Sequence, residues 1–169
     1  MSPAEYLTFI PLLFYGIALA DLLKQWRRFF EIEYLYLPYF ITTIMITEIA
    51  VWNIFLYLEV VTQLAEISYF RYWAHLLQPM IFLMLVSALT PDSSNQDTEG
   101  YFRKRIPAVF GLMALFIASH FSIDSFTFSS LSIARLAGVA ACLAIAITRK
   151  PALVYFMAVI WVVSLLGKI

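Results

Sequence analysis

The segment ITTIMITEIAVWNIFLYLE, residues 41–59, decides the fold class of this chain. A helix that crosses a bilayer needs about 20 mainly apolar residues, and this segment is long and apolar enough to qualify. It lacks the inward–outward alternation of a membrane strand, so we expect a transmembrane helix. A carboxylate, Glu48, lies near its middle. Because a charged side chain is costly in hydrocarbon, Glu48 is the first residue to consider as a site.

The rest of the chain shares this apolar character. Of its 169 residues, 63% are hydrophobic and 13% are charged, and the mean hydropathy is +0.85. Soluble domains have about 45–50% apolar and about 25% charged residues, so one small soluble core could not bury this much apolar surface. The formal net charge is zero, and no basic face points to a nucleic-acid partner.

Six segments have the length and apolarity of membrane-spanning helices. They lie at about residues 6–26, 37–58, 72–90, 106–121, 128–148 and 151–166, and residues 91–105 form the only long polar loop. The fourth segment is short unless the neighbouring stretches YFRKR or SIDSF extend it. The expected fold is all-α: a polytopic membrane protein in which residues 1–169 form one bundle of six transmembrane helices.

Lysine and arginine are distributed unevenly over the expected loops. The first, third and fifth loops hold Lys24, Arg27, Arg28, Arg103, Lys104, Arg105, Arg149 and Lys150. The opposite side holds Arg71 and Lys168. Because cytoplasmic loops carry an excess of Lys and Arg, we expect both termini on the periplasmic side. The N-terminus lacks the basic start of a signal peptide, so the first span is expected in the mature protein.

Aromatic residues gather near the ends of the expected spans. Tyr39, Tyr57 and Trp161 are among them. Tyrosine and tryptophan are enriched at membrane–water interfaces, so the sequence predicts that these side chains belong to interfacial belts.

Three stretches, YGIALADLLKQWRRF, LLQPMIFLMLVSALTPD and GYFRKRIPAVFGL, follow one another over the first two thirds of the chain. Their order resembles an uncharacterised group of small bacterial multi-span membrane proteins. Members look similar in having a small-residue-rich first span that ends in basic residues, then a span that ends in Pro-Asp. A tyrosine-and-arginine segment opens their next span. The resemblance implies a protein of the bacterial inner membrane, and no catalytic residue carries over from it.

Polar and ionisable residues within the spans are the best guide to a site, because such residues usually face the protein interior. The candidates are Glu48, Arg135, Gln78, His75, His120, Asp124, Asn53 and Asp21. At about 1.5 Å per residue, several of them fall at successive depths. The sequence predicts a polar file that runs from Glu48 through Arg135, Gln78, His75 and His120 towards the outer surface.

Glu48 has a structural and a functional interpretation. It could pair with Arg135 and lock the second and fifth spans in register, since breaking such a pair leaves a buried charge. It could instead handle protons or ions, or line a pocket for a ligand or lipid headgroup. The face of the fifth span that carries Arg135 has mostly small side chains, which let another helix approach closely. These side chains are Ser132, Gly138, Cys142 and Ala146.

The remaining candidates have simpler interpretations. His120 and Asp124 share a helical face, either as a polar pair at a helix end or as an acid/base pair. The two histidines lack clustered metal-ligand spacing, so no metal or cofactor is predicted. Asp21 and Lys24 are expected to neutralise one another, and Asn53 points away from Glu48.

Three functions from different classes are compatible with these patterns. The first is a channel- or transporter-like protein that uses the polar file around Glu48. The alternative is a non-enzymatic scaffold, assembly factor or partner subunit, favoured by short loops and the small-residue face. An intramembrane enzyme has the least support, because no nucleophile or metal constellation is present. Besides the lipid bilayer, the expected partners are further copies of the chain or another membrane protein.

Overall fold

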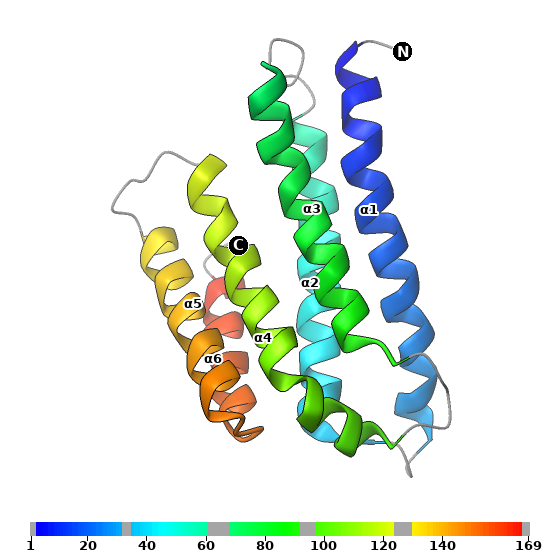
Figure 1. Cartoon of the computed structure of the whole chain (residues 1–169), viewed down its shortest axis with the longest axis vertical. Coiled ribbons are helices and arrows are strands. Elements are labelled where there is room, and N and C mark those ends of the chain that lie inside the picture. The colour runs from blue at the N-terminus through cyan, green and yellow to red at the C-terminus, as the bar shows by residue number, and fades with distance from the viewer. Residues whose placement is uncertain (1–2, 32–34, 61–67, 92–96, 124–129, 167–169) are drawn as a thin grey trace.

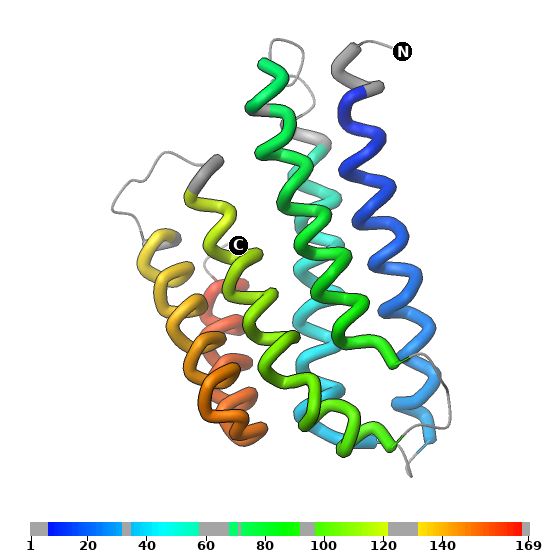
Figure 2. The backbone as a smooth tube through the Cα atoms, viewed as in Figure 1, coloured from blue at the N-terminus to red at the C-terminus, as the bar shows by residue number. Residues whose placement is uncertain are grey.

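The computed structural model describes residues 3–31, 35–60, 68–91, 97–123 and 130–166. Within these ranges the chain is helical and has no strand, which confirms the all-α prediction. The helices are α1 (Pro3–Trp26), η1 (Arg27–Phe30, a 3₁₀-helix), α2 (Leu37–Val60), α3 (Tyr69–Leu89), α4 (Thr98–Ile123), α5 (Ser130–Thr148) and α6 (Leu153–Leu166). They run alternately up and down (Figures 1 and 2).

Four helices in the described residues are long and apolar enough to cross a membrane. Their candidate spans are Leu7–Phe30, Leu37–Tyr57, Tyr72–Leu89 and Thr98–Phe121. The apolar parts of α5 and α6, Ser132–Thr148 and Leu153–Leu166, are shorter. The lengths and composition of the four long helices indicate a membrane protein.

The start of α4 differs from the sequence-based prediction. Residues 98–105, expected in a polar loop, are the first turns of the helix. Asp97 stabilises this start, because its carboxylate accepts hydrogen bonds from the backbone N–H groups of Glu99 and Gly100, both at 3.1 Å. Glu99 also forms an ion pair with Arg103 at 2.8 Å, one helical turn later. The helix thus includes YFRKR, the extension of the fourth segment that the sequence left open, and begins three residues before it. Hydropathy placed the limit at residue 105 because it does not register the cap and the charge pair that favour a helix here.

The helices form a ring in which each packs against two main neighbours. Following the contacts, the order is α1, α3, α4, α5, α6, α2 and back to α1, with a smaller contact between α2 and α4 across the ring. In Figure 1, α1, α3, α4 and α5 lie side by side in front, and α2 and α6 lie behind them. Through this arrangement α2 touches α6, the last helix of the chain.

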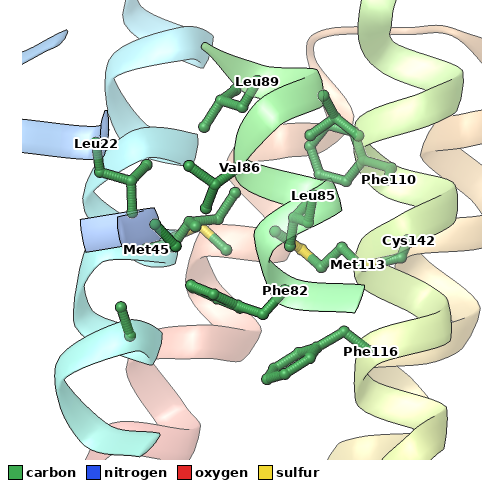
Figure 3. Close-up of a cluster of buried hydrophobic side chains, with 14 of the residues drawn as sticks. Leu22, Met45, Phe82, Leu85, Val86, Leu89, Phe110, Met113, Phe116 and Cys142 are labelled. Carbon is green, nitrogen blue, oxygen red and sulfur yellow. The ribbon is translucent and has the colours of Figure 1, made fainter. Parts of the chain in front are cut away.

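Aromatic side chains fill the centre between α1 and α4. Tyr15 and Phe82 are fully buried, with ring centroids 5.1 Å apart, and Phe82 lies 5.2 Å from Phe116. Figure 3 shows Phe82, with Leu85 of the same helix, between α2 on one side and α4 on the other. This core is continuous, and it extends to Cys142 and Ile145 of α5 and to Val154 and Met157 of α6.

Two residues predicted for the interfacial belts lie in this core instead. Tyr39 is 1% exposed and Tyr57 is 5% exposed. The Tyr57 hydroxyl donates a hydrogen bond to the backbone oxygen of His75, at 3.0 Å, which connects α2 to α3. A tyrosine at a span end can therefore satisfy its hydroxyl within the protein and need not face the interface.

The basic residues of the first, third and fifth connections gather at one end of the bundle, which we call the basic end. It is the lower end in Figure 1, where α1, α3 and α5 end and α2, α4 and α6 begin. Arg103 of α4 lies there over the ring of Tyr36, 6.0 Å from its centroid. Burial raises the pKa of Tyr36, and the nearby positive charge of Arg103 acts in the opposite direction.

Candidate functional site

The centre of the candidate site is a hydrogen bond between α2 and α6. The indole nitrogen of Trp161 donates to a carboxylate oxygen of Glu48 at 2.9 Å. Glu48 lies in the middle of α2, and the side chains of both Glu48 and Trp161 are half-buried. The ring of helices explains the contact, because α6 returns beside α2 after the chain has passed through α3, α4 and α5. A tryptophan inside an apolar helix needs an acceptor for its N–H, and Glu48 provides it.

Trp161 was predicted to belong to an interfacial belt, but its indole forms a hydrogen bond within the bundle instead. The residue lies five positions before the end of α6 and binds the carboxylate in the centre of α2. One sequence signal could have identified it: apart from Tyr155 and Ser164, Trp161 is the only side chain of α6 with a polar hydrogen. The matching acceptor is 113 residues away in the sequence, so local patterns could not connect the two.

Arg135 lies half-buried on α5, whose main neighbours are α4 and α6. Its pairing with Glu48 stays a prediction. The small-residue face of the same helix has an identified neighbour within the chain. Ser132, Gly138 and Cys142 on that face are buried. A Cβ atom added to Gly138 would lie 3.4 Å from the Ile117 side chain of α4, so the small face is where α5 approaches α4.

This packing removes one reason for the scaffold hypothesis. The small residues of α5 were expected to offer a surface to another membrane helix. In the structure α4 covers that surface from within the same chain. A partner protein would therefore have to bind elsewhere on the bundle.

The threonine and asparagine side chains of α2 bond to their own helix. Thr43 and Thr47 donate to the backbone oxygens of Tyr39 and Thr43, at 2.9 and 2.8 Å. The Asn53 amide donates to the backbone oxygen of Ile49 at 2.8 Å. Such bonds satisfy the hydrogen-bonding group of a side chain with a backbone oxygen one helical turn earlier, so that no water is needed. Asn53 therefore contributes its amide to α2 itself, in agreement with its expected separation from Glu48.

Gln78 and His75 lie on α3, whose main neighbours are α1 and α4. Gln78 is buried, and His75 is half-buried and accepts the Tyr57 hydroxyl bond through its backbone. These residues thus lie on a helix that is not among the main neighbours of α2, which carries Glu48. The continuous polar file stays a prediction.

His120 lies near the end of α4 and is half-buried. Its Nδ1 is 3.0 Å from the backbone oxygen of Phe116, and its ring stands edge-on to the Phe116 ring at 4.9 Å. Asp124, its predicted partner, lies outside the described residues. His120 therefore extends the aromatic row of the core towards the end opposite the basic one.

Asp21 forms the expected local ion pair near the basic end. Its carboxylate lies 2.7 Å from the ammonium of Lys24, one turn later in α1. Both side chains are exposed, so the pair contributes little to stability.

Among the residues that the structure describes, no group of three or more His, Cys, Asp or Glu side chains could hold a metal ion. No family model matches this chain, and no curated protein or solved structure matches it either. The resemblance to small bacterial membrane proteins therefore stays a prediction, and a function can be proposed only from the geometry of the chain itself.

Proposed function

We propose that this chain is a six-span protein of the bacterial inner membrane, with the basic end in the cytoplasm, that conducts or transports protons or small cations through Glu48. The observation that carries the proposal is the bond from Trp161 to a half-buried carboxylate in the centre of α2. Ionisable residues at such depth often belong to ion pathways. The uneven distribution of Lys and Arg supports the orientation.

The chemistry required of Glu48 is reversible binding of a proton or cation. The indole N–H of Trp161 is a neutral donor, so it orients the carboxylate without adding charge. An ionised carboxylate accepts this bond, and a protonated one can still accept it through its carbonyl oxygen. The same donor can therefore hold Glu48 in both states while a proton or cation is exchanged.

Access to Glu48 is favoured from the end opposite the basic end. Trp161 lies five residues before the last residue of α6, which is about 7.5 Å along the helix axis. In Figure 1 the upper ends of α5 and α6 lie well below those of α1 and α3. Because α5 and α6 end below α1 and α3, the α2–α6 interface lies closer to water than the length of α2 alone suggests.

The test is ion flux into vesicles reconstituted with the purified full-length chain. A potassium diffusion potential drives protons inward, and a pH-sensitive dye in the lumen reports their entry; sodium and potassium tracers test the cations. We expect flux above protein-free vesicles for the wild type and background flux for Glu48→Gln. The matched control, Glu99→Gln, removes a carboxylate from an exposed ion pair at the basic end and should keep the flux. Background flux of every ion for the wild type would refute the proposal.

A further inference from the structure

A groove lies between α3 and α4 at the basic end of the bundle. In the ring of helices, the pair α3 and α4 lies opposite the pair α2 and α6. Its volume is about 480 Å³. Apolar side chains (Leu83, Met84 and Leu112) line one part, and polar groups (Ser87, Tyr101 and Arg105) line the other. It shares no residue with the site at Glu48.

The polar end of the groove is held in shape by Tyr101. Its hydroxyl lies 3.1 Å from the backbone oxygen of Ala88, in the last turn of α3, and 3.2 Å from that of Thr90, directly after the helix. These contacts join the start of α4 to the end of α3. The Arg105 guanidinium lies over the Tyr101 ring, 5.7 Å from its centroid. The cation is therefore positioned at the groove rather than extended away from the bundle.

The two ends of the groove differ in polarity along the bundle axis. Arg105 and Leu112 both lie on α4, seven residues apart, which corresponds to about 10 Å along the helix. On α3 the apolar Leu83 and Met84 likewise lie further from the basic end than Ser87. Met84, Ser87 and Arg105 are exposed, so the groove is open at its surface. A cationic end and an apolar end about one nanometre apart match an anionic amphiphile.

We propose that this groove binds an anionic phospholipid. The headgroup phosphate binds the guanidinium of Arg105 and the hydroxyl of Ser87, and one acyl chain lies along Leu83, Met84 and Leu112. Charge complementarity favours an anionic headgroup, because Arg105 lines the groove and none of the residues that line it is acidic. A zwitterionic headgroup would bring a second positive charge to this basic surface.

The test measures lipid binding to the purified full chain in detergent by native mass spectrometry. Phosphatidylglycerol is titrated against phosphatidylcholine with the same acyl chains. We expect about tenfold preference for phosphatidylglycerol, the effect of one charge-assisted contact. Arg105→Gln should abolish this preference. The matched control, Lys104→Gln, removes the adjacent exposed charge, which does not line the groove, and should keep it.

A second variant tests whether the lipid occupies the groove itself. Ser87→Phe places a bulky ring in the groove at an exposed position, so it should block phosphatidylglycerol without unfolding the chain. Competition with inorganic phosphate distinguishes a lipid from a free anion, and it should displace little lipid. Equal binding of the two lipids, equal losses in Arg105→Gln and Lys104→Gln, unchanged binding in Ser87→Phe, or full displacement by phosphate would each overturn the proposal.

Discussion

The bundle combines two regions that differ in how they use apolar residues. In α1–α4, large side chains such as Tyr15, Phe82 and Phe110 are completely buried. In α6, which has the most apolar sequence of all the helices, only Val154 and Met157 are buried. Most of its other large side chains are exposed, including Phe156 at 61% and Val163 at 63%.

The difference shows that apolarity and burial are separate properties in a membrane protein. Lipid is as apolar as leucine, so a helix surrounded by lipid needs apolar residues on every side without packing them against protein. The polar contact of α6, Trp161 to Glu48, is correspondingly specific. We infer that α1–α4, which hold most of the large buried side chains, provide most of the packing stability, and that α6 contacts α2 through this polar pair.

The largest expected effect concerns this difference in packing. Phe82→Ala should lower the free energy of unfolding by about 2–4 kcal/mol, because it leaves a cavity between two aromatic rings. The matched change on α6, Phe156→Ala, should cost less than about 0.5 kcal/mol, because that side chain is already exposed. Unfolding in mixed micelles with increasing denaturing detergent measures both values. Equal losses would contradict the proposed division into two regions.

A smaller effect is expected for the contact between the regions. In a double-mutant cycle, Trp161→Phe and Glu48→Leu, which removes the acceptor, should show a coupling energy of about 0.5–1.5 kcal/mol, the range of hydrogen bonds within membranes. The same unfolding measurement supplies the four free energies. Additive single changes would mean that the indole and the carboxylate act independently.

An effect of similar size separates two tyrosines within the core. Tyr57→Phe should cost about 0.5–1.5 kcal/mol, since its hydroxyl bond to His75 is lost. Tyr15→Phe should be neutral or slightly stabilising, because the buried Tyr15 hydroxyl has no hydrogen-bond partner among the described residues. Thermal unfolding in detergent compares the two variants. A larger loss of stability for Tyr15→Phe than for Tyr57→Phe would show that the Tyr15 hydroxyl stabilises the core beyond the packing of its ring.

Much of the helical pattern could be predicted from hydropathy. The start of α2 at Leu37 and the end of α5 at Thr148 coincide with the expected limits. The start of α4 could not be predicted in this way, because hydropathy measures preference for lipid. The Asp97 cap and the Glu99–Arg103 pair stabilise a helix that extends beyond the apolar stretch.

The site was predictable only in part. Glu48 is conspicuous in the sequence because ionisable residues are rare within apolar spans. Its donor Trp161 was not, since tryptophan in an apolar segment is common near interfaces. Which helix lies beside α2 depends on the closure of the whole ring, and hydropathy does not specify the order of helices around a bundle. The small side chains on one face of α5 predicted that another helix packs closely there, but only the structure identified that helix as α4.

The short length of α6 has a consequence for the membrane around the protein. Its 14 residues extend about 21 Å, whereas a typical hydrocarbon core is about 30 Å thick. A bilayer that surrounds an inserted α6 can adapt by becoming thinner beside it, whereas α1, with 24 residues, is about 36 Å long and spans the full thickness. Hydrophobic mismatch of this kind favours thin bilayers and short acyl chains. The lipid composition would then regulate the side of the protein that carries Glu48 and Trp161.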